Sequence, residues 1–379
     1  MRILLSGGGT GGHIYPALAV AHELRERHSA ELLYLGDLNG LETKLVPAAN
    51  VPFVGVAAGR LRRYLSLGTL TDLGRIPLGV AQAMRHVAEF KPDAAFTSGG
   101  YVAVPAGFAA RWHGVPLMMH QQDVPPNLAN RLLTPLATRI SVSFPDSMRY
   151  FPRNRTALTG NPVREEVLAV AAIGPTRQAA FKAQFGLDPA VPVVLVTGGS
   201  QGARHINQVV ADALPHVLPV CQVLHVSGEK THAETRARAE AALTATDATL
   251  RARYQLHPYL TDQMPAALAA CDVAVCRSGA ATLAELATVG KPGLLVPLPP
   301  GFTGSPQAIN AEMFQRAGAA AVTLDRDLSV ESLCAALLPL LQDAPRRDAM
   351  GQAARTLARP DAAATLAQAV VALAQQRRQ

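Results

Sequence analysis

The chain contains few cysteines and few aromatic residues, and each shortage argues against a class of protein. Its 379 residues include four cysteines, none of them in a C-x-x-C pair. In a chain this long we interpret them as reduced thiols of a cytosolic protein, and Cys276 as a small core side chain, because disulfide frameworks are typical of small secreted domains. Aromatic residues make up 5% of the sequence and no basic run is long, so we expect no nucleic-acid partner.

Long hydrophobic segments are also missing. No stretch approaches the roughly 20 apolar residues that a transmembrane helix needs, and the apolar run in MRILLSGGG is too short for the core of a signal peptide. Hydrophobic residues nevertheless make up 49% of the chain, against 17% charged residues, which is typical of a folded protein with large cores. We expect a protein that is soluble or lies on a membrane surface, and its net charge of +7 favours anionic partners.

Short apolar runs alternate with helical patterns along the chain. Helical spacing is clear at 17–27 and 101–112. The runs that resemble buried strands are 2–6, 32–35, 52–56, 94–97, 115–119, 139–142, 193–197, 220–226, 273–276, 293–296 and 320–324. This alternation predicts parallel sheets covered by helices on both faces. A chain of 379 residues exceeds the size at which one core usually stops growing, which predicts two domains.

A faint internal repeat supports two similar halves. ILLSGGGTGGHIYP near the amino terminus and VVLVTGGSQGARHIN from residue 193 both have the pattern of a strand, a glycine turn and a helix. The turn-rich TGNPV at 159–163 separates the two series of strands. We therefore predict one domain over residues 1–160 and a second over 161–358. The alanine-rich tail, 360–379, is predicted to form a helix that packs on its own domain or back on the first.

The glycine turn GGGTGGH at residues 7–13 predicts a binding site. Glycines after a first strand let a ligand approach the backbone. The helix that follows offers free N–H groups and a partial positive charge, which suits phosphate or a developing anion. His13 follows the last glycine directly, where a helix cap is the alternative to a catalytic role. We favour catalysis, because a second glycine turn at 198–202 is expected across a cleft between the two halves.

The same glycine spacing also matches a dinucleotide-binding fingerprint. Gly7, Gly9 and Gly12 have the required intervals, and Asp37 stands at the end of the presumed second strand. An NAD-dependent dehydrogenase is therefore an alternative function. The second glycine turn argues against it, since an enzyme with one dinucleotide cofactor has no use for two such turns.

Sequence blocks spread over nearly the whole chain resemble the MurG family of N-acetylglucosaminyltransferases. They are GGGTGGHIYPALAVA, SGGYVAVPAGFAA at 98–110, HQQDVPPNLANRLL at 120–133, TGNPVR at 159–164, GGSQGARHIN at 198–207, RSGAATLAELATVGKPGLLVPLP at 277–299 and PQAINA at 306–311. The resemblance implies a GT-B glycosyltransferase fold, in which two Rossmann-like domains with parallel sheets face a central cleft. It implies inverting transfer of N-acetylglucosamine (GlcNAc) from UDP-GlcNAc to the muramyl O4 of undecaprenyl-pyrophosphoryl-MurNAc-pentapeptide in peptidoglycan synthesis. No metal and no cofactor are expected.

The resemblance also implies which residues bind the substrates. The acceptor pyrophosphate is assigned to Gly11, Gly12, Gly99, Gly100 and Tyr101. Donor-binding residues are Thr10, Gly11, Gly12, His13, Asn127, Arg164, Ser200, Gln201, Gly202, Ser278, Gly279, Ala280, Thr282, Glu285, Gln307 and Asn310. Glu285 is assigned to the ribose hydroxyls, and the two amides at 307 and 310 to the donor sugar. Helix amino termini and cationic side chains would carry the charge of the departing UDP.

Inverting transfer needs a base for the acceptor hydroxyl. His13 is the candidate for this base or for a hydrogen-bond donor to the acceptor phosphate, since an imidazole can serve as either near neutral pH. The family's H-E-Q-N block here reads His120-Gln121-Gln122-Asp123, and Gln121 cannot act as a base. Either His13 or Asp123 therefore removes the proton, or the family's glutamate only orients other groups.

A second departure lies just before Gln307, where the family places polar residues, often with a histidine. Here Ser305 and Pro306 occupy these positions. The prediction that the protein binds UDP is unchanged, but the prediction that the donor sugar is GlcNAc is weakened.

The acidic triplet 325–327, Asp-Arg-Asp, is interpreted as a solvated turn and helix start, not as a metal site. Other UDP-sugar enzymes of this fold, such as a lipid glycosyltransferase or an epimerase, and a non-catalytic sugar-nucleotide-binding protein remain alternatives.

A basic and apolar segment at 59–78 predicts contact with anionic lipid. The residues assigned to this contact are Arg62, Arg63, Leu65, Leu67 and Leu70. An amphipathic helix packed on the sheet is the alternative. The resemblance implies a peripheral position at the cytoplasmic face of the inner membrane, because the acceptor lipid stays in the bilayer. Expected partners are UDP-GlcNAc, the acceptor lipid, the anionic membrane surface and cell-wall synthesis proteins.

Overall fold

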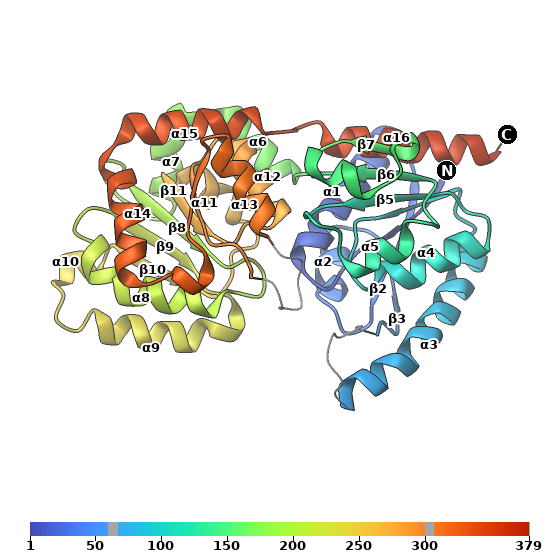
Figure 1. Ribbon diagram of the computed structural model, residues 1–379, viewed down its shortest axis with the longest axis horizontal. Coiled ribbons are helices and arrows are strands. Elements are labelled where there is room, and N and C mark those ends of the chain that lie inside the picture. Colours follow the sequence, from blue (N-terminus) through green and yellow to red (C-terminus); the bar gives the residue numbers. More distant parts are fainter. Residues whose placement is uncertain (60–66, 300–306, 379) are drawn as a thin grey trace. The chain divides into compact units, whose positions relative to one another are not determined.

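The computed structural model describes residues 1–59, 67–299 and 307–378, and of residues 67–74, 76 and 175 it describes the backbone only (Figure 1). The chain forms two compact units. The first comprises the chain up to Arg164 and again from Arg359 onwards, and the second comprises most of the chain from Glu165 to Ala358. Each unit is an α/β fold around one parallel sheet, so the fold class predicted from the strand–helix alternation is confirmed.

The first unit contains a seven-stranded sheet with the order β3-β2-β1-β4-β5-β6-β7. The strands are β1 (Arg2–Ser6), β2 (Glu31–Asp37), β3 (Phe53–Val56), β4 (Ala94–Thr97), β5 (Leu117–Gln121), β6 (Arg139–Val142) and β7 (Thr156–Leu158). The order reverses between β1 and β4, whose last residues, Ser6 and Thr97, are paired. The turns that follow these two strands therefore lie side by side, which is where open α/β sheets bind ligands.

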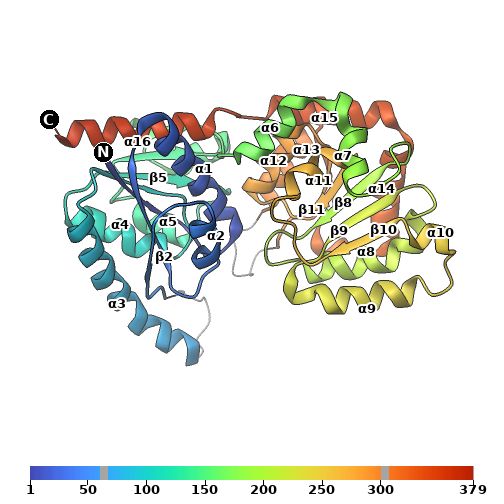
Figure 2. The same cartoon turned by 180° about the vertical axis from the view of Figure 1, so that it is seen from behind.

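Helices cover both faces of this sheet. They are α1 (Gly11–His28), α2 (Glu42–Ala48), α3 (Leu67–Phe90), α4 (Ala103–Trp112), α5 (Leu128–Leu133) and α16 (Ala362–Arg378). On one face, α1 and α16 lie side by side (Figures 1 and 2), and Leu366 and Val370 of α16 belong to the same core as Ile3 and Val20. The other core lies under α3 and α4. The tail helix thus completes the core of the first unit.

Polar contacts hold the end of α16 in place. Arg378 makes two hydrogen bonds to Asp93, with its Nε and Nη2 atoms 2.9 and 2.7 Å from the carboxylate oxygens. Arg377 donates to the carbonyl groups of Pro92 and His113. Both acceptor segments flank strands of the first sheet, so α16 is joined to this unit by contacts far apart in sequence.

The second unit repeats the arrangement with a six-stranded sheet, β10-β9-β8-β11-β12-β13. The strands are β8 (Val193–Thr197), β9 (Gln222–Val226), β10 (Tyr254–His257), β11 (Val273–Cys276), β12 (Gly293–Leu295) and β13 (Ala320–Val322). The helices are α6 (Glu165–Ile173), α7 (Gln178–Gln184), α8 (Arg204–Val217), α9 (His232–Ala242), α10 (Ala248–Arg251), α11 (Met264–Ala270), α12 (Ala280–Val289), α13 (Ala308–Arg316), α14 (Val330–Gln342) and α15 (Ala344–Thr356). The order reverses between β8 and β11, and the turns after these two strands are the second set of predicted site residues.

Two strands were not predicted, and the first helix begins earlier than expected. β7 and β10 lie at sheet edges and are exposed or half-buried, so neither has the continuous apolar run of a buried strand. Helix α1 begins at Gly11, not near Ala17. Gly12 and His13 therefore belong to its first turn, and the glycine segment is partly helical.

Candidate functional site

The turn between β1 and α1 is packed against side chains of the same unit. A Cβ atom on Gly7 would lie 1.9 Å from Ser98 Oγ, one on Gly8 1.6 Å from Glu42 Oε1, and one on Gly9 2.6 Å from the Tyr101 ring. The space at these glycines is therefore filled by the protein's own side chains. Among the atoms that the structure describes, a Cβ on Gly12 would meet only Thr10 Oγ1, at 3.6 Å. The space predicted for a pyrophosphate next to the backbone is therefore present at Gly12. At the three earlier glycines this space is filled by the protein, so the prediction is not supported there.

His13 is held by the turn after β4 and by the end of β5. Its Nδ1 atom lies 3.1 Å from the Ser98 carbonyl oxygen and 3.1 Å from Gln122 Nε2. Gln122 also donates to that carbonyl, at 2.9 Å. In the tautomer that carries its proton on Nδ1, His13 donates to Ser98 and keeps the lone pair on Nε2. The Ser98 carbonyl then accepts from both His13 and Gln122, and these two donors do not hydrogen-bond each other. That arrangement suits a base and gives Gln122, which the sequence analysis left without a role, a place beside the imidazole.

The electrostatics of His13 also suit a base. Burial lowers the pKa of His13 below its usual value, while the negative charge of Asp123 and the hydrogen bond with Ser98 oppose this shift by raising it. The imidazole is therefore neutral at neutral pH and can accept a proton. Asp123 would stabilise the imidazolium once the proton has moved.

Gln121 occupies the position of the family's glutamate and is fully buried. Its Oε1 accepts a hydrogen bond from Asn130 Nδ2 at 2.7 Å, and its Nε2 donates to the Asp123 carbonyl at 2.5 Å. This amide orients the segment that carries Asp123. The neighbouring His120 is also buried between Ser141 and Asn161, and burial lowers its pKa to about 4. His120 is therefore a neutral structural group.

The predicted acceptor turn after β4 interlocks with the first glycine turn. Gly99 and Gly100 have φ angles of +100° and +85°, which favour glycine. A Cβ on Gly100 would lie 2.2 Å from the Gly8 carbonyl oxygen. Tyr101 donates to Asp37 at 2.6 Å. Asp37, the acid that matched the dinucleotide-binding fingerprint, thus accepts a hydrogen bond from Tyr101 of the same unit.

Glu42 is a buried carboxyl behind the glycine turn that the sequence analysis missed. It is 0% exposed, and Oε1 accepts a hydrogen bond from Gly9 N–H at 2.9 Å. Within the described residues, Oε2 has no hydrogen-bond partner. Burial raises the pKa of Glu42, hydrogen bonds from backbone N–H groups lower it, and the nearby charge of Asp37 raises it again, with an upward net shift. In the sequence, Glu42 looks like any acidic residue at a helix start.

We expect Glu42→Gln to be less harmful than Glu42→Ala. The amide keeps an acceptor for Gly9, whereas alanine leaves that buried N–H unpaired, which costs about 1–3 kcal/mol of unfolding free energy. A raised pKa means that the wild-type residue contributes stability that is fully present below its unfolded pKa and is lost as the pH rises through its folded pKa. Glu42→Gln has no such loss. Urea unfolding at pH 4, below the ordinary glutamate pKa of 4.5, and at pH 8 measures both effects, and equal losses in the two variants would contradict this role.

The turn between β8 and α8 is the first donor-side candidate in the second unit. Gly199 has a φ angle of +76°, and a Cβ there would meet no atom of the described residues within 4 Å. Gly202, at φ +73°, is packed against the Ser227 carbonyl. Gln201 accepts a hydrogen bond from Lys230 at 3.4 Å, and Ser200 lies in the same turn. Open space for a ligand is thus found at Gly199. The predicted donor-binding residues Ser200, Gln201 and Gly202 follow it directly in the chain.

The turn between β11 and α12 contains the other donor-side residues. Ser278 donates to the Gln307 carbonyl at 3.0 Å, and Asn310 donates to the Ser278 carbonyl at 3.0 Å. Asn310 is fully buried, so it supports the turn from behind, which argues against its predicted contact with the donor sugar. Gly279 is the N-cap of α12 and Ala280 its first residue. Thr282 and Glu285 follow on this helix and are half-buried.

Several predicted residues have structural contacts of their own. Asn127 is the N-cap of α5 and accepts a hydrogen bond from Asn130 N–H at 2.9 Å. The Arg164 guanidinium lies 4.5 Å from the centre of the Tyr15 ring. Thr10 is exposed at the N-cap of α1. Arg62, Arg63, Leu65, Ser305 and Pro306 lie outside the described residues, as do the side chains of Leu67 and Leu70.

The prediction for the acidic triplet was partly wrong. Residues 325–327 form a single 3₁₀ turn, but the Asp325 side chain is 17% exposed and paired with Arg277 and His205. Asp325 is therefore a partly buried ion-pair residue, which the sequence did not indicate. Among the described residues, no group of three or more His, Cys, Asp or Glu side chains could hold a metal ion.

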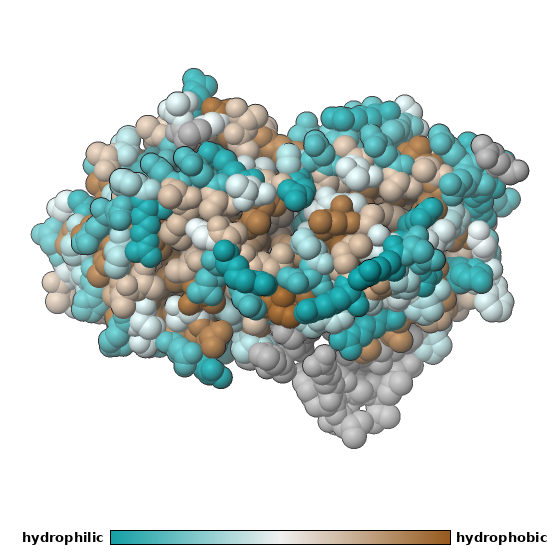
Figure 3. Space-filling model, turned by 45° about the horizontal axis from the view of Figure 1, so that its top comes forward, coloured by the Kyte–Doolittle hydropathy of each residue, from teal (hydrophilic) through white to brown (hydrophobic). Residues whose placement is uncertain are grey.

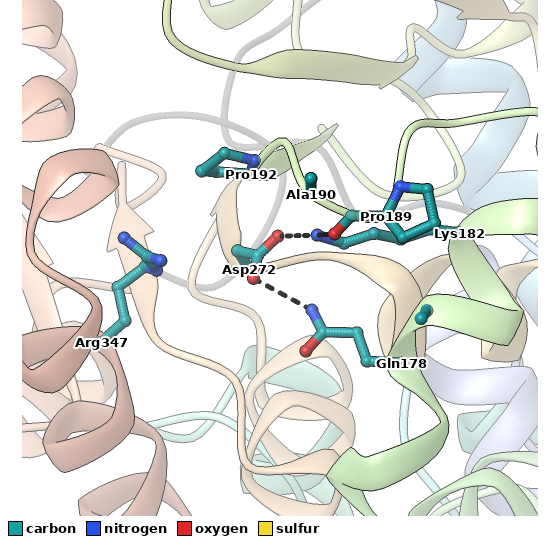
Figure 4. Close-up of a pocket in the computed structure, with 8 residues that line it drawn as sticks. Gln178, Lys182, Pro189, Ala190, Pro192, Asp272 and Arg347 are labelled. Atoms are coloured by element: carbon teal, nitrogen blue, oxygen red, sulfur yellow. Dashed lines mark hydrogen bonds and ion pairs between the residues drawn. The ribbon is translucent and has the colours of Figure 1, made fainter.

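The cavity drawn in Figure 4 lies at the opposite end of the second sheet. It has a volume of about 270 Å³ and is lined by Lys182, Asp272 and Gln178 among others. Asp272 accepts hydrogen bonds from Val193 N–H, at the start of β8, and from Gln178. Lys182 lies 2.9 Å from Asp272 and also donates to two backbone carbonyls. These polar groups form hydrogen bonds and an ion pair with one another. We therefore interpret the residues around the cavity as structural and not as a ligand-binding site.

Comparison with known proteins identifies the family. The family model of the glycosyltransferase family 28 N-terminal domain matches residues 3–142, and that of the family 28 C-terminal domain matches residues 193–366. The UDP-N-acetylglucosamine--N-acetylmuramyl-(pentapeptide) pyrophosphoryl-undecaprenol N-acetylglucosamine transferase of Desulfitobacterium hafniense is 40% identical over 366 residues, 96% of each chain. The chain belongs to the MurG family, within glycosyltransferase family 28. The resemblance seen in the sequence blocks is confirmed.

Other similar proteins support the assignment of the chain to the MurG family. The Bacillus subtilis protein of the same name is 36% identical over 97% of this chain and 98% of its own. The crystal structure of Acinetobacter baumannii MurG has a TM-score of 0.71 and 26% identity, and covers 98% of this chain and 99% of that one. A UDP-GlcNAc 2-epimerase from Neisseria meningitidis, at 15% identity and a TM-score of 0.68, shares the fold only. The chain is a glycosyltransferase with a GT-B fold, and the dehydrogenase alternative was wrong.

Proposed function

We propose that this glycosyltransferase transfers GlcNAc from UDP-GlcNAc to the muramyl O4 of undecaprenyl-pyrophosphoryl-MurNAc-pentapeptide, with inversion and without a metal. Such transfer is a step of peptidoglycan synthesis, and hence of cell-wall growth, cell shape and division. The observation that carries the proposal is the agreement of relatives that match 96–97% of the chain at 36–40% identity and bear this activity in their names. For the epimerase alternative, the Neisseria meningitidis UDP-GlcNAc 2-epimerase is 15% identical and shares the fold alone.

The first unit supplies the acceptor chemistry in this proposal. The muramyl 4-hydroxyl attacks the anomeric carbon of GlcNAc, the bond from that carbon to the UDP oxygen breaks, and the hydroxyl proton passes to His13 Nε2. Asp123 balances the charge of the imidazolium that forms. Gln121 and Gln122 orient these groups through the hydrogen bonds described above, so a glutamate at position 121 is not required. Gly12 and the first turn of α1 bind the acceptor pyrophosphate.

The second unit supplies donor binding and charge stabilisation. The departing UDP carries negative charge, and the amino termini of α8 (Arg204–Val217) and α12 (Ala280–Val289) provide the positive ends of two helix dipoles. Gly199 gives the diphosphate access to the first of these turns, while Ser278 and Gly279 form the second. Glu285 accepts hydrogen bonds from the ribose hydroxyls.

The test is a transfer assay with labelled UDP-GlcNAc, a short-chain analogue of the acceptor lipid, and chelator present. UDP-glucose in a parallel reaction measures the choice of donor. We expect transfer of GlcNAc alone, unaffected by the chelator. Transfer from UDP-glucose but not from UDP-GlcNAc would place the enzyme with other lipid glycosyltransferases. UDP binding without any transfer would indicate a sugar-nucleotide-binding protein.

We also propose that the protein acts at the cytoplasmic face of the inner membrane, where its acceptor lipid resides. None of the described helices has the length and apolarity to cross a bilayer. On α4, Trp112 and Phe108 stand one helical turn apart with side chains 76% and 42% exposed, beside Arg111, which is also exposed. Exposed aromatic and basic side chains suit a membrane interface. On the face drawn in Figure 3, hydrophobic residues form small islands among hydrophilic ones.

Trp112→Ser should weaken binding to vesicles that contain anionic lipid and leave UDP binding unchanged. The indole is largely exposed in the first unit, so its loss removes interfacial contact with little effect on the core. Co-sedimentation with vesicles measures the effect. Leu324→Ser, at an exposed leucine of the second unit, is the matched control. Equal vesicle binding by both variants and the wild type would refute an interfacial role for α4.

A further inference from the structure

Asp325 joins two turns of the second unit that are not adjacent in sequence. Its Oδ2 atom lies 3.2 Å from Nδ1 of His205, the second residue of α8. Its Oδ1 atom lies 2.5 Å from Nη1 of Arg277, directly after β11. The two oxygens of one carboxylate are thus divided between the β8–α8 turn and the β11–α12 turn. Asp325 itself follows β13, at the edge of the sheet.

The Arg277 side chain is held by several acceptors. Besides the ion pair, its Nη1 atom donates to the carbonyl oxygens of Val296 and Pro297 at 3.2 and 3.3 Å. The Arg277 and Asp325 side chains are 14% and 17% exposed. Within the described residues, Asp325 Oδ1 accepts no hydrogen bond, so the 2.5 Å contact is an ion pair without hydrogen-bond alignment. Arg277 thus depends on the charge of Asp325, because two neutral carbonyls alone would leave a largely buried cation poorly compensated.

The neighbouring acid shows what an ordinary surface residue looks like here. Asp327 lies on the same 3₁₀ turn, is 59% exposed, and has the adjacent Arg326, at 3.6 Å, as its one ion-pair partner in the described part of the chain. Such an exposed pair contributes little. Asp325 and Asp327 therefore offer a matched comparison between a carboxylate that bridges two turns and one that does not.

We propose that Asp325 is a positioning residue that fixes the β8–α8 and β11–α12 turns relative to each other, and so sets the affinity for the diphosphate of the donor. The proposal rests on the proposed function, in which both turns bind the UDP diphosphate. A diphosphate that contacts both turns requires their N–H groups at one fixed spacing, and a mismatch weakens binding without changing the reacting groups. Uridine lacks phosphate, so the affinity of the protein for uridine does not depend on the spacing of the two turns.

The test compares Asp325→Asn with Asp327→Asn in the full chain. For Asp325→Asn we expect about a tenfold rise in KM for UDP-GlcNAc and in Kd for UDP, which corresponds to about 1.4 kcal/mol. The kcat at saturating donor, the KM for the acceptor analogue and the Kd for uridine should stay within about twofold of wild type, the scatter expected of uncoupled sites. Asp327→Asn should match wild type throughout. A thermal unfolding scan checks that both variants remain folded.

A second arm uses His205→Ala, alone and combined with Asp325→Asn. If one carboxylate couples the two turns, removing His205 weakens UDP binding in the wild-type background and adds nothing in the Asp325→Asn background. Additive effects, equal losses for UDP and uridine, or UDP binding unchanged in Asp325→Asn would overturn the proposal. If the wild type binds UDP but transfers no GlcNAc, the proposed reaction fails while the binding comparison still tests Asp325. If the wild type binds no UDP, both fail.

Discussion

His13→Ala lowers kcat by about 10²–10⁴-fold, the range expected for loss of a general base, and leaves the Kd for UDP unchanged. His13 is the imidazole whose Nδ1 donates to the Ser98 carbonyl, which leaves Nε2 as the site that accepts a proton. In the proposed function the turns that bind the UDP diphosphate belong to the second unit, so we expect donor affinity to be unchanged. A rise in the Kd for UDP would instead support the donor contact that the family resemblance implies for His13. Steady-state kinetics and calorimetric titration with UDP measure the two quantities.

The matched control is His28→Ala, in the last turn of the same helix, which should retain full activity. If His13 instead serves as a donor to the acceptor phosphate, the main effect is a rise in KM for the acceptor. A variant with wild-type kcat would contradict the assignment of His13 as the base.

The pH profile separates the two roles of His13. The pKa of His13 is lowered from 6.5 by burial, and a base must be neutral to work. Activity therefore falls on acidification with a midpoint below pH 6.5. Asp123 raises this pKa, so Asp123→Asn should move the midpoint to still lower pH. A cationic phosphate donor would show the opposite trend, with activity rising as the pH falls.

Removal of residues 359–379 should abolish the stable fold of the first unit and spare UDP binding by the second. Leu366, Val370 and Leu373 of α16 are almost fully buried against the sheet and α1. A single Leu366→Ala change is expected to cost about 2–5 kcal/mol, and loss of the whole helix removes all such contacts from a fold that is typically stable by only about 5–15 kcal/mol. Denaturant unfolding of Leu366→Ala measures the point effect.

Gln368→Ala, at an exposed position of the same helix, is the control and should unfold like wild type. Proteolysis of the truncated chain should degrade the first unit and leave a UDP-binding fragment that begins near Glu165. Loss of UDP binding together with the first unit would show that α16 also stabilises the second unit, contrary to this prediction.

The sequence was most informative where structure is determined locally. Buried parallel strands appear as continuous apolar runs, so β1, β4, β8 and β11 were predicted at their observed bounds. The edge strand β7 was not predicted, because it is exposed or half-buried and its sequence contains no continuous apolar run. The glycine turns were recognised because their spacing is local as well.

The site was harder to predict where contacts span long distances in sequence. Glu42 binds Gly9 from 33 residues away, and Asp325 approaches His205 from 120 residues away. Each looks like an ordinary surface acid in its own segment. The glycines were expected to make room for a ligand, yet Gly7, Gly8 and Gly9 make room for side chains from two other parts of the unit, the turn after β4 and the start of α2. No local pattern distinguishes these two uses of a glycine.

The return of α16 to the first unit has a consequence for folding during synthesis. The core around Ile3 and Val20 needs Leu366 and Val370, which leave the ribosome only after the second unit has been translated. At about 5–20 residues per second, the 194 residues from Glu165 to Ala358 (358 − 165 + 1) take about 10–40 s. For that interval the apolar surface of α1 and the sheet lacks its cover. A chaperone that binds exposed apolar surface is therefore expected to associate with the nascent first unit until α16 emerges.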